Sequence, residues 1–267
     1  MPSRREPPRV CIYGDSHIGG AGRAHAAGLI DWPVGAEVEF WGADGPRFRQ
    51  IRWEDGVIRA SGEAIETVKR INAKGRDHLR PDDFDLFIFY SARLRVAQFM
   101  APLYEWRCDH GLWPSEAVRL RSAAFFLQCI RSYRIARLVA AAGSSVVILP
   151  APFLTDGVVD LSRKGGFLHE YPRSEQATKD ELDTMWETLV TAAREDGVTL
   201  IPQPQDTVTK GMLTKYEFAC KDAIEKKDAG HKSDRFAALR ITEALAHFNQ
   251  QRTTNPISTD CPSSHAG

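Results

Sequence analysis

The chain has 267 residues, of which 43% are hydrophobic and 26% are charged, a composition typical of one large globular domain. Its 35 basic residues balance its 35 acidic residues, which argues against a nucleic-acid partner, because nucleic-acid-binding proteins usually carry a clustered positive excess. No stretch approaches the ~18 uninterrupted apolar residues of a membrane span, and the polar N-terminus lacks the apolar core of a signal peptide.

The five cysteines are scattered along the chain and never form a Cys-x-x-Cys pair. An odd number at irregular spacing indicates neither a disulfide framework nor a zinc site. We therefore expect a protein of the cytoplasm with free thiols and no metal.

Five short apolar runs, most of them ended by glycine or proline, predict strands. They are residues 9–13, 37–41, 85–90, 145–149 and 198–201. Helices are predicted between them and after the last one, at 18–29, 61–71, 115–143, 174–190 and 233–248, with a small hairpin at 51–60. Strands that alternate with helices predict an α/β protein with a doubly wound parallel sheet, in which ligands bind beyond the carboxyl ends of the strands.

The predicted domain spans residues 9–250. Residues 1–8 are expected to form a flexible N-terminus, and residues 251–267, rich in Ser, Thr and Pro, a disordered tail. Residues 94–115 are rich in aromatic side chains and are expected to form a helical insertion near the strand ends. Aromatic rings at that place could stack on an acyl chain or a sugar ring of a substrate.

The turn Gly14-Asp15-Ser16 connects the first predicted strand to the first predicted helix. It places the Ser16 hydroxyl at the open rim of the sheet, where backbone N–H groups at the start of the helix point toward a developing oxyanion. His17 follows directly, and we expect it only to cap or pack against the start of the helix. Ser16 is thus a candidate nucleophile, provided that a general base lies near it.

The best candidate for that base is His231, which lies shortly before the last predicted helix. Asp228 precedes it by three residues, close enough to orient the imidazole from the same turn. The final helix would bring both residues to the rim that carries Ser16. The predicted catalytic residues are therefore Ser16, His231 and Asp228.

An early Gly-Asp-Ser after a strand and a late Asp-x-x-His before a C-terminal helix resemble the GDSL/SGNH hydrolase superfamily. The resemblance covers nearly the whole domain. It implies a three-layer, flavodoxin-like sandwich with a five-stranded parallel sheet. It also implies an esterase in which serine attacks an acyl carbonyl, histidine is the general base and aspartate supports it.

The resemblance further implies an oxyanion hole. Its expected donors are the backbone N–H of Ser16 and that of Gly45, in the segment Trp41-Gly-Ala-Asp-Gly45 after the second strand. The family places an asparagine after the third strand, whereas this chain has Tyr90-Ser91-Ala92-Arg93. Arg93 is the expected substitute for the missing donor, with Ser91 as an alternative.

Substrate contacts are expected from Asp15, Arg93 and Arg95. The guanidinium fork of an arginine suits a carboxylate or a phosphate, so these arginines, together with Arg107 and Arg119, could recognise an anionic group.

The sequence thus predicts a serine esterase that acts on a small-molecule or carbohydrate O-acyl ester through an acyl-serine intermediate, without a cofactor. An O-acyltransferase on the same scaffold needs the same triad and stays open, as does a binding protein that kept the fold without catalysis. A nucleotide-binding flavodoxin-like protein is disfavoured because the first loop lacks a glycine-rich phosphate cradle.

Overall fold

The computed structural model describes residues 7–162 and 166–254. Its central sheet has five parallel strands in the order β2-β1-β6-β7-β9. These strands are β1 (Arg9–Gly14), β2 (Glu37–Gly42), β6 (Leu86–Ser91), β7 (Ser145–Pro150) and β9 (Thr199–Leu200). The five strands and the all-parallel sheet agree with the prediction from the sequence.

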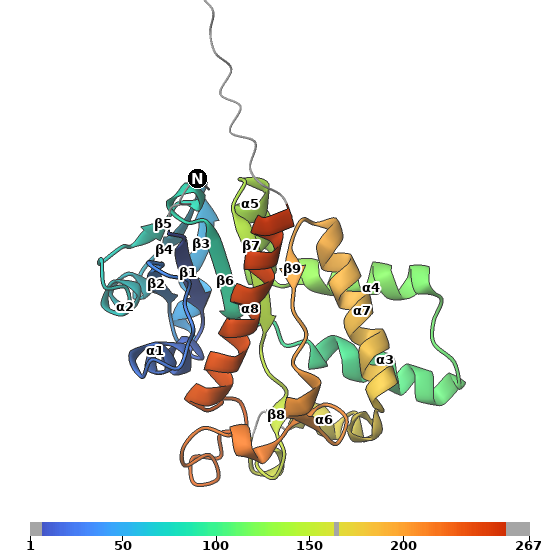
Figure 1. Cartoon of the computed structure of the whole chain (residues 1–267). Coiled ribbons are helices and arrows are strands. Elements are labelled where there is room, and N and C mark those ends of the chain that lie inside the picture. The colour runs from blue at the N-terminus through green and yellow to red at the C-terminus, as the bar shows by residue number, and fades with distance from the viewer. Residues whose placement is uncertain (1–6, 163–165, 255–267) are drawn as a thin grey trace, which may run out of the picture.

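The sheet is the middle layer of three, as Figure 1 shows. On one face the strands pack against α1 (Ile18–Ala26) and α8 (Asp234–Thr254), in a core that includes Ile12, Ile88 and Ile241. The opposite face packs against α2 (Ala64–Ile71), α5 (Arg131–Ala141) and α7 (Lys179–Glu195). Farther from the sheet lie α3 (Ala97–His110) and α4 (Glu116–Cys129), of which α4 packs against α5 and α7. The three-layer sandwich is therefore the fold of this chain.

Smaller elements surround this sandwich. One three-stranded sheet contains β3 (Ile51–Glu54), β4 (Val57–Ala60) and β5 (His78–Leu79). The other contains β8 (Leu154–Thr155), β10 (Val208–Thr209) and β11 (Leu213–Thr214), and it lies near the short helix α6 (Gly166–His169) at the end of the sandwich where β1, β6 and β7 terminate (Figure 1).

Two glycines allow the central strands to approach each other closely at their carboxyl ends. A Cβ on Gly42 would lie 1.9 Å from the carbonyl oxygen of Gly14, and a Cβ on Gly14 would lie 2.5 Å from the carbonyl oxygen of Tyr90. Neither distance is possible for a real side chain. The three strands therefore end side by side, and the loops that follow β1, β2 and β6 leave the sheet from one small area.

The helix boundaries differ from the prediction in several places. The long helix expected at 115–143 is two helices, because Ile130 has extended backbone (φ −88°, ψ 117°) between α4 and α5. Ser174 does not cap the next helix. Thr178 does, through a capping box with Glu181, so the helix starts later than expected. The last helix continues to Thr254.

The predicted insertion at 94–115 contains the regular helix α3. Most of the expected flexible N-terminus and of the expected tail, residues 1–6 and 255–267, lies outside the described residues. Among the described helices, none combines the length and the apolar character that crossing a bilayer requires.

Candidate active site

Ser16, His231 and Asp228 form one hydrogen-bonded chain although 215 residues separate the serine from the histidine. His231 Nδ1 donates to Asp228 Oδ2 at 2.6 Å, which leaves Nε2 as the acceptor for the Ser16 hydroxyl at 2.8 Å. The structure brings together all three residues predicted to be catalytic. The arrangement has the geometry of a nucleophile, a base and an orienting carboxylate.

The loop that carries His231 is held from several sides. The second oxygen of Asp228 accepts the backbone N–H groups of Gly230 and His231, both at 3.1 Å, so the carboxylate is fixed within its own turn. The buried ammonium of Lys232 donates to the carbonyls of Ala229 and Gly230, at 2.8 and 3.1 Å. These bonds set the backbone from which the His231 ring reaches Ser16.

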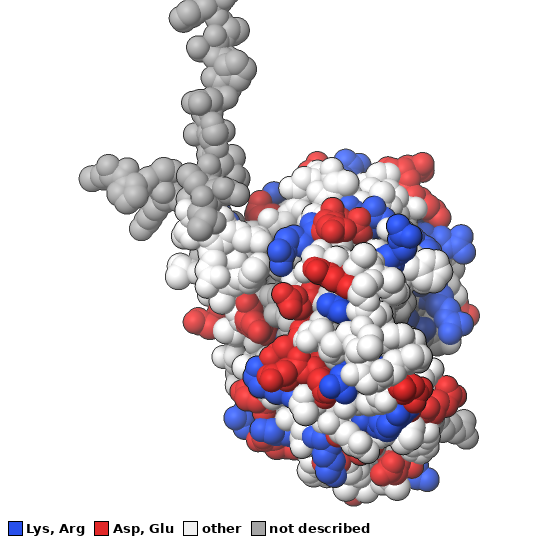
Figure 2. Space-filling view, turned by 90° about the vertical axis from the view of Figure 1, so that its right-hand side faces the viewer, with Lys and Arg blue, Asp and Glu red and all other residues white. Residues whose placement is uncertain are grey.

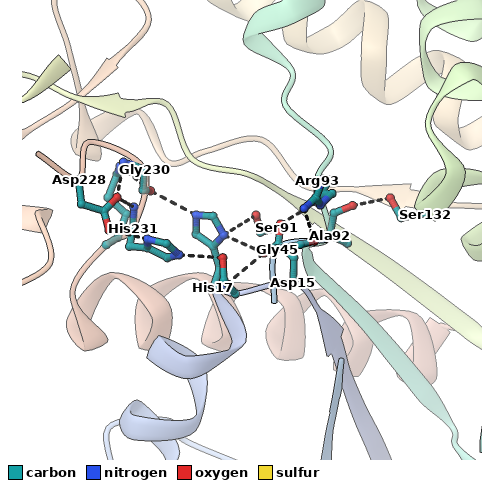
Figure 3. A network of polar contacts seen from close by, with 12 residues as sticks. Asp15, His17, Gly45, Ser91, Ala92, Arg93, Ser132, Asp228, Gly230 and His231 are labelled. Carbon is teal, nitrogen blue, oxygen red and sulfur yellow. Dashed lines mark hydrogen bonds and ion pairs between the residues drawn. The ribbon is translucent and has the colours of Figure 1, made fainter. Parts of the chain in front are cut away.

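A second aspartate–histidine pair lies beside the first (Figure 3). His17 Nδ1 donates to Asp15 Oδ1 at 2.8 Å, and Nε2 lies 3.3 Å from the carbonyl oxygen of Gly230. The hydroxyl of Ser91 lies 3.1 Å from His17 Nδ1, and the His17 ring packs against the His231 ring with 4.5 Å between centroids. His17 thus connects the loops after β1 and β6 with the loop that carries His231.

Asp15 is buried, yet it is held as a carboxylate. Burial opposes its ionisation, but donors on His17 and the backbone N–H of Arg93 outweigh burial and lower the pKa of Asp15 to about 2. Oδ1 accepts the side chain and the backbone N–H of His17, and Oδ2 accepts the Arg93 N–H at 3.1 Å. Both oxygens of Asp15 thus accept bonds from protein donors that hold the loops together. Asp15 also lines a hollow beside Ser16, and its contact with substrate stays a prediction.

The loop after β6 has an unusual backbone. Ser91, Ala92 and Arg93 all have positive φ (61°, 39° and 60°), a conformation that costs a non-glycine residue about 1 kcal/mol or more. The Arg93 N–H bond to Asp15 and the bond from Ser132 Oγ to the Ala92 carbonyl (2.5 Å) hold the loop in this conformation. Strain that surrounding contacts maintain in this way is typical of functional sites.

This loop directs the Arg93 side chain to the loop after β2, where its guanidinium donates to the carbonyl of Gly45 (Figure 3). The two residues expected to complete the oxyanion hole are therefore neighbours. The backbone N–H groups of Ser16 and Gly45 make no hydrogen bond with another described residue, so both are free to donate to a ligand.

Two hollows meet at Ser16. One, of about 420 Å³, is lined by Ser16, Phe40, Arg70 and Ile71 among others, and the second, of about 510 Å³, is lined by Ser16, Asp228 and His231. A third, smaller cavity of about 100 Å³ is lined by Arg95 and shares His17 with the second hollow. Ser16 is thus accessible from two sides.

The other predicted arginines have structural partners. Arg107 pairs with Glu181 at 2.7 Å and lies over the rings of Tyr104 and Trp113. Arg119 donates to the carbonyl of Pro114. Neither lines one of the three hollows just described.

Sequence reasoning missed His17, Ser91 and Lys232 as members of this network. The Asp15-x-His17 spacing on the turn and the position of Lys232 directly after His231 were visible signals, but the partner loops were not. Across residues 7–162 and 166–254 no cluster of three His, Cys, Asp or Glu side chains is placed to hold a metal ion.

Comparison with known proteins found no matching family model and no similar protein among curated sequences. Among solved structures, the periplasmic domain of a lipopolysaccharide acetyltransferase from Salmonella ser. Paratyphi A is similar, with 11% identity and a TM-score of 0.37 over 90% of this chain and 84% of that chain. A TM-score this low supports no conclusion about the activity of this chain.

Proposed function

We propose that the protein is a serine hydrolase that cleaves a carboxylic ester, with Ser16 as nucleophile. The observation that carries this proposal is the continuous chain from Ser16 Oγ through His231 to Asp228, at 2.8 and 2.6 Å. A serine hydroxyl is a poor nucleophile by itself, and a positioned imidazole removes its proton as the bond to carbon forms.

In the proposed reaction Ser16 Oγ attacks the ester carbonyl while His231 Nε2 takes its proton. The N–H groups of Ser16 and Gly45 and the Arg93 guanidinium stabilise the negative oxygen that develops. The tetrahedral intermediate then collapses, and the leaving alcohol departs with the proton from His231. A water molecule, activated by the same histidine, hydrolyses the acyl-serine.

Arg93 takes the place of a neutral donor in this scheme. Removal of one oxyanion donor lowers turnover by about 10²- to 10³-fold in serine hydrolases, so some group must fill the position. A guanidinium has the additional advantage of positive charge. Its contact with the Gly45 carbonyl keeps it beside the Gly45 N–H.

Covalent labelling tests the nucleophile. A fluorophosphonate probe is expected to modify the wild-type protein at Ser16, as located by peptide mass spectrometry, and to leave Ser16→Ala unlabelled. p-Nitrophenyl acetate hydrolysis should disappear in the same variant. A folded wild-type protein that is neither labelled nor active would indicate a binding protein instead.

The same triad serves an O-acyltransferase, in which a sugar hydroxyl replaces water. The hollow of about 510 Å³ that contains Ser16 and His231 offers space for such an acceptor. Product analysis with an added sugar alcohol separates the two reactions, because transfer yields an acylated sugar and hydrolysis yields a free acid.

A further inference from the structure

Arginines on the outer helical face are neutralised by neighbouring carboxylates. Figure 2 shows the side of the molecule that carries α3, α4 and α7 in Figure 1, where basic and acidic side chains are interspersed. Arg173 pairs with Glu105 at 2.7 Å, and Arg137 pairs with Asp196 at 2.9 Å. Such pairing is ordinary for a chain with equal numbers of acidic and basic residues.

Arginines near the candidate site lack this compensation. The guanidinium groups of Arg49 and Arg95 are exposed and form no ion pair with any carboxylate of the described residues. Arg93 is close to Asp15, but both oxygens of Asp15 accept bonds from backbone or His17 donors. The exposed guanidinium groups of Arg49 and Arg95 therefore have no ion-pair partner among the described carboxylates, whereas Arg93 lies near the carboxylate of Asp15.

These charges act on one another. Burial lowers the pKa of Arg93, Asp15 opposes that effect, and the positive charges of Arg49 and Arg95 lower it further. The pKa of Arg131 is also lowered, first by partial burial and then by the positive charges of Arg93 and two other arginines. Repulsion between these arginines in a partly buried place is unfavourable, and a bound anion would offset that repulsion.

Arg95 also lines the small cavity of about 100 Å³ beside His17. Its walls are mostly apolar and include Ala97, Phe153 and Phe167, while Gln98 adds an amide. His17 lines both this cavity and the hollow of about 510 Å³ that contains Ser16 and His231, so the two spaces adjoin at His17. It suits a short apolar segment that leads from the reacting ester to a charged end.

We propose that the substrate is an anionic ester, whose carboxylate or phosphate group is bound by Arg95 with support from Arg93. The inference rests on the proposed ester hydrolysis for the identity of the reacting group. Arginine is suited to this task because its planar fork binds two oxygens of either anion at once.

Matched substrates test the charge. The rate constant kcat/KM for p-nitrophenyl hemisuccinate should exceed that for p-nitrophenyl butyrate, which has the same acyl length without the charge. Arg95→Gln should reduce this ratio by roughly 10- to 100-fold, since one charge-assisted contact is lost. Arg95→Lys should retain part of the preference.

Two further variants localise the effect. Arg59→Gln removes the same charge from an exposed position on β4 that lines none of the three hollows, and it should leave the ratio unchanged. Arg70→Gln removes an exposed charge from the hollow of about 420 Å³ on another side of Ser16. A larger loss of preference in Arg70→Gln than in Arg95→Gln would overturn the assignment.

A second substrate pair shows whether the recognised anion lies on the acyl group or on the alcohol of the ester. An acetyl ester of glycerol phosphate carries its charge on the alcohol, whereas hemisuccinate carries it on the acyl group. A preference for either over its uncharged counterpart supports the proposal, provided that Arg95→Gln diminishes it. The absence of both preferences contradicts it.

Binding without turnover keeps this inference separate from the proposed reaction. The melting temperatures of the wild-type protein and of Arg59→Gln should be higher in succinate or inorganic phosphate than in sodium chloride of equal ionic strength. The same increase should be much smaller for Arg95→Gln. If Ser16 is not labelled but this pattern appears, the esterase proposal fails and the anion site stands. If esters are cleaved but no variant changes the shift or the preference, the anion site fails alone.

Discussion

The two aspartate–histidine pairs contain the same side chains within one network, yet they meet different partners. In the inner pair the side chains of Asp15 and His17 are only 9% and 13% exposed, and His17 Nε2 faces the carbonyl of Gly230. In the outer pair those of Asp228 and His231 are 24% and 31% exposed, and His231 Nε2 faces the Ser16 hydroxyl.

A carbonyl oxygen has no proton to give, so the Nε2 of His17 faces a partner toward which it cannot act as a base. A hydroxyl can give up its proton, so the same nitrogen of His231 can act as a base. In the proposed mechanism, the group opposite Nε2 therefore distinguishes His17, a structural histidine, from His231, the base. Variants of the two pairs should therefore behave differently.

The largest difference is expected for the proposed base. His231→Gln should reduce kcat for ester hydrolysis by about 10⁶-fold, as loss of the base does in other serine triads. Steady-state assays with p-nitrophenyl acetate measure it, and circular dichroism checks that the variant folds. Loss of less than about tenfold would remove His231 from the role of base.

Asp228→Asn should reduce kcat by about 10⁴-fold, because an amide cannot hold the His231 ring in the tautomer that leaves Nε2 free. The KM should change much less than kcat, since the aspartate touches no substrate in the proposed mechanism. Equal effects on both constants would point to a disturbed substrate site instead.

His17→Phe keeps an aromatic ring but removes the bonds to Asp15 and Gly230. We expect kcat to fall by roughly ten- to a hundredfold, the scale of a small misplacement of catalytic groups. Fluorophosphonate labelling of Ser16 should persist at a lower rate. A loss as large as that of His231→Gln would show that His17 takes part in proton transfer.

Asp15→Asn should act on stability. The pKa of Asp15 is lowered from 3.8 to about 2 on folding, so its ionisation contributes about 2 kcal/mol at neutral pH. That contribution is present above pH 3.8 and is lost as the pH falls toward 2. The free energies of unfolding of wild type and Asp15→Asn, measured with urea, should differ by about 2 kcal/mol at pH 7 and converge as the pH falls toward 2. A difference independent of pH would contradict this origin.

The smallest effect is expected for Ser91→Ala, which removes the hydroxyl beside His17 Nδ1. The left-handed backbone at this position remains equally strained with alanine, so only the hydrogen bond is lost, at about 1 kcal/mol. Urea unfolding measures this loss, and kcat should stay within about twofold of wild type. A strong loss of activity would instead give Ser91 the place of the missing oxyanion donor.

Local pattern and chain order were enough to predict the five strands, the position of the Gly14-Asp15-Ser16 turn and the meeting of Ser16 with Asp228 and His231. These features follow from short apolar runs and from the rule that parallel strands end at one edge of a sheet. They need no knowledge of how individual side chains pack.

Only the tertiary structure decided the roles of Asp15, His17 and Arg93. Each acts through a partner on another loop, such as Gly230 for His17 and Gly45 for Arg93, and no local pattern reports which loops face each other. The break at Ile130 has the same cause, because a helical pattern continues through it while the backbone turns. The sequence by itself determined that Ser16, Asp228 and His231 would meet at the end of the sheet, and long-range packing determined what surrounds them.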